Sequence, residues 1–104
     1  MVEAKFDETI HAPVRLRICG LLRRPVDRLD FAVLRDALGV SDATLSKHLK
    51  TLSTSGYVTS SKAASAGRDD SRRLTWLALT RTGQSAFDAH VRALQQIAGS
   101  PADV

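Results

Sequence analysis

The chain has 104 residues, of which 43% are hydrophobic and 25% charged, so it suits one globular domain and is too short for two ordinary ones. No apolar run approaches the ~20 residues that a membrane-spanning helix needs, and residues 1–5 lack the basic start and apolar stretch of a signal peptide. The single cysteine, Cys19, excludes an internal disulfide and favours a reducing compartment. We therefore expect one cytoplasmic domain that spans residues 1–104.

The formal net charge of +4 is concentrated in the middle of the chain. Residues 41–81 contain seven Lys or Arg and three Asp or Glu, whereas basic and acidic residues nearly balance in residues 1–40. A basic surplus permits a polyanionic partner such as nucleic acid without proving one. A phosphate-facing surface is therefore expected within residues 41–81.

The first predicted element is an amphipathic helix that begins near Ile10 and ends before Pro25. Apolar residues recur at helical spacing on one face, and arginines occupy the other faces. Pro13 suits the first turn of this helix, where a missing N–H costs nothing. The apolar face consists of Ile10, Val14, Ile18, Leu21 and Leu22.

Two further helices are predicted on either side of a tight turn. The first runs over Phe31–Leu38 after Asp30 as N-cap, and Gly39 fits the left-handed position that ends many helices. The second runs over about Asp42–Thr54 after Ser41 as N-cap. Two helices joined in this way form a helix-turn-helix, whose second helix is the one that reads DNA.

A β-hairpin and a last helix complete the predicted fold. Tyr57–Ser65 is rich in Val, Thr and Ser and has no helical period, and a polar turn separates it from Leu74–Thr80. The second segment alternates, with Leu77 and Leu79 on one side and Trp76 and Ala78 on the other. Thr80 can cap a last helix that ends at Gly99. The predicted fold is therefore mainly α with a small β-hairpin (α+β), a winged helix-turn-helix in the order helix, helix, helix, hairpin, helix.

The outward face of the third predicted helix has the composition of a DNA-reading surface. A stripe of Leu45, Leu49 and Leu52 defines the buried side and leaves small, hydroxyl and lysine side chains opposite. Small residues allow close approach, hydroxyls bond bases or phosphates, and lysines neutralise phosphate or reach guanine. A solvated helix face is the alternative interpretation. The candidate DNA-binding residues here are Ser41, Ala43, Thr44, Ser46, Lys47, Lys50 and Thr51.

Basic residues also surround the turn of the predicted hairpin, where they suit contacts with the DNA backbone or the minor groove. Asp69 and Asp70 lie at the tip, where they can pair with these arginines or restrict how deeply the tip inserts. The alternative interpretation is a solvated hairpin turn. The candidate wing contacts are Lys62, Arg68, Arg72 and Arg73.

Taken together, these segments resemble the MarR/ArsR-like winged-helix regulators, and in particular the short winged-helix DNA-binding family. The resemblance implies a homodimeric repressor whose recognition helices enter adjacent major grooves. The chain departs from the family at Ala43-Thr44, where Gly-Asn is frequent, and at His90, where tyrosine is frequent. The resemblance covers about Phe6 to Leu94 and rests on Ile10–Leu16, Phe31–Leu34, Leu45–Leu49, Ser55–Val58, Leu79–Gly83 and Ala86-Phe87.

An enzyme is the least supported class of function. His11, His48 and His90 are far apart in the sequence and belong to no nucleophile or metal motif. Some ArsR relatives sense metals through paired cysteines, whereas here Cys19 has only His11 or His90 as a co-ligand. We therefore expect no cofactor and no metal, a buried structural Cys19 and a half-buried structural His48.

A homodimer is expected because a chain this small has a limited core, and its first and last helices have wide apolar coverage. The partners are then double-stranded DNA and a second copy of the chain, with no effector identified. The competing function is a winged-helix protein-docking module, in which the outward face of the third helix would tend to be apolar. The candidate dimerisation residues are Ile10, Val14, Ile18, Phe87, Val91, Leu94 and Ile97.

Overall fold

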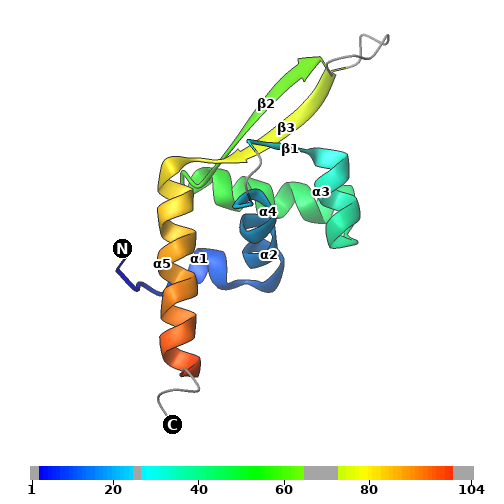
Figure 1. The fold of residues 1–104 in the computed structure, drawn as a ribbon. Helices are drawn as coiled ribbons and strands as arrows, with labels where there is room; N and C mark the ends of the chain where they lie inside the picture. The colour runs from blue at the N-terminus through cyan, green and yellow to red at the C-terminus, as the bar shows by residue number, and fades with distance from the viewer. Residues whose placement is uncertain (1–2, 25–26, 65–72, 100–104) are drawn as a thin grey trace.

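The computed structural model describes residues 3–24, 27–64 and 73–99 of the chain. Its elements follow the predicted winged helix-turn-helix order, with α5 along one side of the other helices and the β2–β3 hairpin extending away from them (Figure 1). None of the helices in these residues is long and apolar enough to cross a membrane. The elements are α1 (Glu8–His11), α2 (Pro13–Leu22), β1 (Leu29–Asp30), α3 (Phe31–Leu38), α4 (Asp42–Thr54), β2 (Val58–Ala64), β3 (Arg73–Leu79) and α5 (Arg81–Ala98).

Local sequence signals set the ends of α3, α4 and α5. The side chains of Asp30, Ser41 and Thr80 each accept a backbone N–H from the first turn of the helix that follows. Gly39 ends α3 in the left-handed conformation with φ 67°, which glycine adopts readily because it has no Cβ. The predicted bounds of α3 and α4 are therefore confirmed.

The single first helix expected from Ile10 onward is two helices in the structure. Ala12 lies between them with ψ 131°, outside the helical region, because a residue that precedes proline disfavours the α conformation. Asp7 caps α1 by accepting the N–H of Ile10 at 3.1 Å. Pro13 therefore opens α2 and does not lie inside a longer helix.

The sheet is antiparallel with strand order β1-β3-β2. β2 and β3 form the predicted hairpin, in which Val58 lies opposite Leu79 and Ser60 opposite Leu77. Leu77 and Leu79 lie on one side of β3 and Trp76 on the other, as predicted, and the structure shows that the side of the two leucines faces the core. The two-residue strand β1 was not predicted, because two residues carry no alternation pattern.

One buried cluster joins α1, α2, α3, α4, β2 and β3, and it fixes the orientation of α4. Leu45, Leu49 and Leu52 of α4 are all buried in this cluster. Burial of a leucine side chain stabilises a fold by about 1.5–3 kcal/mol, so rotation of α4 about its axis is costly. The cluster consists of Ile10, Ile18, Cys19, Leu22, Leu34, Leu45, Leu49, Leu52, Val58, Leu77 and Leu79.

Candidate nucleic-acid interface

The residues predicted to read DNA lie together at the start of α4 and along its exposed side. Because the buried leucines of α4 face the core, the opposite side of this helix faces solvent. The structure thus places these residues on one surface, which we call the α4 face. It consists of the exposed residues Ser41, Ala43, Ser46, Lys47 and Lys50 and the half-buried residues Thr44 and Thr51.

Hydrogen bonds within the α4 face decide which hydroxyl protons remain available to a ligand. Ser41 Oγ accepts the N–H of Thr44 at 3.1 Å and donates to Thr44 Oγ1 at 3.0 Å. Thr51 Oγ1 donates to the carbonyl oxygen of Lys47 at 3.2 Å. Thr44 therefore keeps its hydroxyl proton for an external acceptor such as a phosphate oxygen, whereas Thr51 can only accept.

The charges of the α4 face are positive. Among the described residues, neither Lys47 nor Lys50 forms an ion pair with a carboxylate. Asp42 in the first turn of α4 is bound by Arg35 at 2.9 Å, and Arg35 also binds Asp36 at 3.0 Å. The hydrogen bonds to Asp42 and Asp36 raise the pKa of Arg35 above its ordinary value. The acidic residue nearest the α4 face is therefore neutralised by a neighbouring cation.

His48 fastens the inner edge of α4 to the helices beneath it. The guanidinium of Arg15 donates to His48 Nδ1 at 3.2 Å and also binds the carbonyl oxygen of Thr9. Burial, and then the charges of Arg15 and Lys47, lower the pKa of His48. His48 is therefore a neutral acceptor at neutral pH, and its predicted half-buried position is confirmed.

The hairpin contributes Lys62 to the described surface. Its side chain is exposed, and its position opposite Thr75 puts both residues on one face of the sheet. Arg68 and Arg72 lie outside the described residues, and Arg73 is described only by its backbone in β3. The DNA contacts of these arginines stay a prediction.

A groove between α4 and the sheet was not predicted. Ser53, Ser60 and Thr75 line this groove but were absent from the candidate residues. Strand alternation contains the missing signal, since Ser60 and Lys62 lie on the same face of β2 as the buried Val58. The groove has a volume of about 340 Å³ and is lined by Phe31, Ser46, Leu49, Lys50, Ser53, Ser60, Thr75 and Leu77.

The structure brings His11 and His90 together, although they are far apart in the sequence. Their ring nitrogens lie 3.3 Å apart, and His90 is fully buried. Cys19 is also buried, as predicted, and this burial is the main cause that raises its pKa to about 12. Within the described residues no group of three or more His, Cys, Asp or Glu could hold a metal ion.

Some of the residues predicted to form a dimer surface have no exposed side chain. Ile10 and Ile18 are fully buried in the core of the chain itself, so the prediction is wrong for them. The sequence pattern marked them as apolar helix positions, but it could not separate the core from a partner surface. The remaining candidates keep exposed area and are Val14, Phe87, Val91, Leu94 and Ile97.

The family assignment follows from a match over most of the chain. Residues 14–98 match the family model described as a winged helix DNA-binding domain. The chain therefore belongs to the winged helix DNA-binding domain family. The family model describes a domain that binds DNA, and the chain is thereby assigned to this class of protein and not to a family of enzymes.

Solved structures agree with this assignment at the level of the fold. A transcriptional regulator homologue from Pyrococcus horikoshii OT3 is similar with a TM-score of 0.78 and 22% identity, over 88% of this chain and 86% of that chain. The transcriptional repressor BigR from Xylella fastidiosa is similar with a TM-score of 0.56 and 27% identity, over 86% and 76%. A comparison with curated protein sequences gave no match. The resemblance to MarR/ArsR-like winged-helix regulators is therefore confirmed.

Proposed function

We propose that the chain is a sequence-specific regulator of transcription that binds double-stranded DNA and acts as a homodimeric repressor in the cytoplasm. The α4 face is the observation that carries this proposal. It combines small and hydroxyl side chains with two lysines that form no ion pair among the described residues, on a helix that buried leucines hold in one orientation. A helix with such a face fits the major groove, where hydroxyls and lysines contact base edges and phosphates.

Different parts of the surface then have different tasks. Thr44 and Ser46, near the start of α4, face base edges, and Thr44 retains a donor for them. Lys47 and Lys50 neutralise phosphates or reach guanine. Lys62 on the hairpin contacts the backbone, together with the arginines predicted for the wing turn. Contacts with phosphates position a protein on the duplex, whereas contacts with base edges specify the sequence.

A second copy of the chain is the proposed partner of α5. His90 and Ala93 of α5 are buried, but Ile97, one turn further along the same side, is 71% exposed. Figure 1 shows why, since the last turns of α5 extend beyond the other helices. The apolar side of α5 thus extends past the core of its own chain, and a partner is needed to cover it. A twofold pair of α5 helices covers this side in both copies at once.

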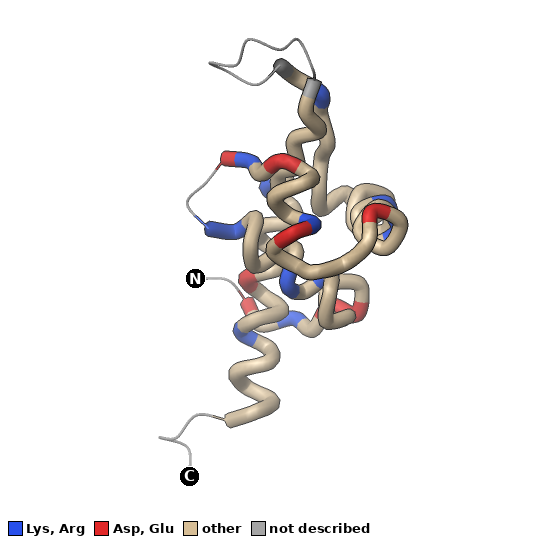
Figure 2. The backbone as a smooth tube through the Cα atoms, turned by 90° about the vertical axis from the view of Figure 1, so that its right-hand side faces the viewer, with Lys and Arg blue, Asp and Glu red and all other residues tan. Residues whose placement is uncertain are grey.

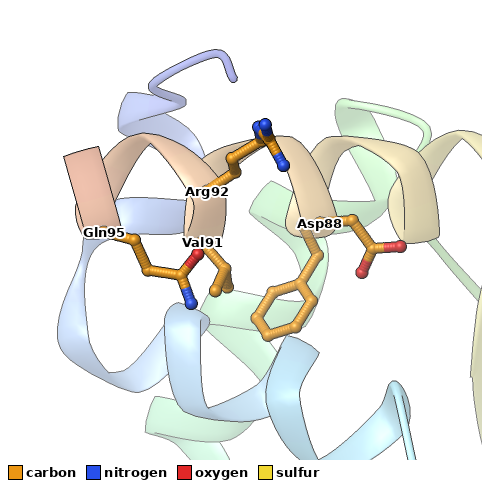
Figure 3. A pocket seen from close by; sticks show the side chains of 5 residues that line it. Asp88, Val91, Arg92 and Gln95 are labelled. Atoms are coloured by element: carbon orange, nitrogen blue, oxygen red, sulfur yellow. The ribbon is translucent and has the colours of Figure 1, made fainter. Parts of the chain in front are cut away.

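The neighbouring side of α5, that of Val91 and Gln95, has a hollow into which the partner can pack. Val91 and Gln95 point to one side of the helix, where a shallow hollow of about 270 Å³ lies (Figure 3). Asp88 at its rim is already bound by Arg23 at 2.9 Å. The turns that follow, residues 93–98, carry no Lys, Arg, Asp or Glu (Figure 2). A second copy can therefore cover residues 93–98 without burying a charge, while Arg92, which also lines the hollow, stays at its edge in contact with solvent or with a carboxylate of the partner.

Repression follows from occupancy of the DNA. A dimer that places two recognition helices on one duplex covers the site and prevents other proteins from using it. The similarity to a protein named as a transcriptional repressor, BigR from Xylella fastidiosa, supports this choice over activation.

The competing function, a protein-docking module, fits the α4 face less well. A docking surface on this helix would tend to be apolar, because protein interfaces bury apolar cores. Ala43 is the single apolar residue among the exposed residues of α4. The polar and positive character of the face therefore favours a nucleic-acid partner.

The test is selection of bound duplexes from a random pool, followed by binding of the selected duplex over a series of salt concentrations. Lys47→Ala is expected to lower the affinity and to reduce the slope of log K against log salt by about 1 for each phosphate that a subunit no longer neutralises. Lys5→Ala is the matched control, because Lys5 is an exposed lysine whose backbone N–H binds Ala89 of α5 and not α4. If a folded Lys47→Ala protein binds with unchanged affinity and salt slope, the α4 face does not contact DNA, and the protein-docking function becomes the better supported one.

A further inference from the structure

The groove between α4 and the sheet has walls of a distinct chemistry. Its polar groups are the hydroxyls of Ser46, Ser53, Ser60 and Thr75, together with the ammonium of Lys50. None of the described residues that line it is acidic. Hydroxyls and lysines are among the side chains that bind phosphate oxygens of nucleic acids. The walls are therefore suited to an anion that is extended along the groove.

The floor of the groove is apolar. It contains Leu49 and Leu77, which are 8% and 2% exposed, together with Phe31. Free phosphate has no surface that suits such a floor, because all of its atoms are polar. A deoxyribose ring does, since its carbon atoms can cover apolar side chains while the attached phosphates reach the walls. The combination of walls and floor fits a sugar–phosphate strand.

Strand register shows how β2 and β3 supply this surface. Ser60 lies opposite Leu77, and Lys62 lies opposite Thr75, so all four residues share one face of the hairpin. Lys62 is exposed and follows Ser60 on that face toward the hairpin turn. The polar surface of the groove therefore extends toward the hairpin turn, where Lys62 adds a second lysine beside Lys50.

The position of the groove matches the geometry of a duplex. In B-DNA one sugar–phosphate strand separates a major groove from the adjacent minor groove. If α4 lies in the major groove and the hairpin lies over the minor groove, that strand must run between α4 and the hairpin. The groove lies between these elements, with α4 on one side and β2 and β3 on the other.

We infer that this groove binds one sugar–phosphate strand of the duplex, and that Ser60 and Thr75 bind its phosphates. This inference rests on the proposed DNA-binding function. Lys50 and Lys62 flank the strand and neutralise its charge. The α4 face then reads the bases on one side of the strand, and the wing lies on the other side. The hairpin thereby sets how deeply α4 enters the major groove.

The experiment uses Thr75→Val and Ser60→Ala, which remove hydroxyls with little change of shape, on the selected duplex and on several unrelated duplexes at low salt. Each variant is expected to lower the affinity roughly threefold to tenfold for each subunit bound, the effect of removing one hydrogen bond, by a similar factor on all duplexes. The salt slope should stay unchanged because a neutral hydroxyl releases no counterion. Thr75→Ser, which keeps the hydroxyl, is expected to bind like the parent protein.

Ser61→Ala is the matched control, because Ser61 is a serine of the same strand on the opposite face of the sheet. Its affinity should equal that of the parent protein, and thermal melts confirm that every variant is folded. A second arm replaces single phosphates of the selected duplex by uncharged methylphosphonate. When the phosphate that Thr75 binds is the one replaced, the parent protein and Thr75→Val should bind the modified duplex with equal affinity.

Two results would overturn the inference, and they are distinguishable. If Thr75→Val and Ser60→Ala bind normally while Lys47→Ala binds weakly, the groove does not hold the strand, although the protein still binds DNA through α4. If Lys47→Ala also binds normally, the proposed function fails together with the groove.

Discussion

His11 Nδ1 and His90 Nε2 lie 3.3 Å apart and join α1 to the middle of α5. The other ring nitrogen of His90, Nδ1, accepts the N–H of Asp7 at 2.9 Å. Because a backbone N–H can only donate, His90 Nδ1 carries no proton, and Nε2 donates to His11. The ring of Phe6 lies against both imidazoles, with centroid distances of 4.7 and 4.8 Å. The structure therefore has a place for a neutral His90 and none for a charged one.

The stability of the fold should therefore fall as the pH falls below neutrality. Burial, and then the proximity of His11, lower the pKa of His90 in the folded protein, while Asp7 has a smaller opposing effect. An unfolded histidine has a pKa of about 6.5, so below that value the unfolded chain binds more protons than the folded chain. Stability is then complete above about pH 6.5 and declines as the pH falls toward the lowered folded-state pKa.

Urea unfolding between pH 7.5 and pH 5 measures this decline, with a slope of at most about 1.4 kcal/mol per pH unit for each proton. His48, whose pKa is also lowered, contributes in the same direction, so His90→Gln should remove only part of the slope. A free energy of unfolding that stays constant over this pH range would contradict the prediction.

Gly83 should not tolerate a side chain. A Cβ at this position would lie 2.1 Å from the carbonyl oxygen of Tyr57, a backbone atom that also accepts the N–H of Thr80. Gly83→Ala must push α5 away from this turn, and overpacking of this kind costs about 1–3 kcal/mol. Urea unfolding measures the cost.

Gly20→Ala is the control for Gly83→Ala, since a Cβ on Gly20 meets only the ring of Phe87 at the ordinary contact distance of 3.7 Å. Because alanine is favoured over glycine inside a helix by about 0.5–1 kcal/mol, this variant should be at least as stable as the parent protein. Equal free energies of unfolding for the two variants would show that α5 is not seated on Tyr57 as described.

The sequence predicts features that depend on local contacts and misses those that depend on contacts between distant parts of the chain. Asp30, Gly39 and Ser41 act on their own helix ends, so pattern and cap residues were enough to place α3 and α4. The contact of His11 with His90 spans 79 residues along the chain, and no periodicity reports it. Likewise, the groove depends on how α4 lies against the sheet, a packing relationship that appears only in three dimensions.

Cys19 should be unreactive in the folded protein. Its side chain is fully buried, and burial, together with the charge of Asp7, raises its pKa to about 12. Because the thiolate is the reactive form, a disulfide reagent at pH 8 should label the native protein slowly and the urea-unfolded protein at the rate of an ordinary cysteine. Absorbance of the released thiolate follows both reactions. Native labelling at the unfolded rate would contradict the buried, structural role of Cys19.

Sequence preference should depend on α4 and general affinity on the hairpin. Thr44→Ala removes a hydroxyl near the start of α4 whose proton is free to bond a base edge, so the selected DNA sequence should change. Lys62→Ala removes an exposed charge on β2 and should weaken binding to all duplexes by a similar factor. Selection from a random duplex pool with each variant compares the two. A changed preference for Lys62→Ala with an unchanged one for Thr44→Ala would reverse these assignments.

The exposed end of α5 should hold the dimer together. Ile97 is 71% exposed on the side of α5 that is buried one turn earlier at Ala93, so a second copy would cover it. Ile97→Asp places a charge in that contact, and an unpaired buried charge is strongly unfavourable, so the dimer should dissociate. Light scattering should give twice the chain mass of 11.3 kDa for the parent protein and the single mass for the variant.

Val33→Asp is the control, because Val33 is an exposed apolar residue of α3, 53% accessible and distant in sequence from α5. Its substitution should leave the dimer intact. A parent protein with a mass of 11.3 kDa at micromolar concentration would contradict the dimer, and a dimeric Ile97→Asp protein would move the interface away from this end of α5.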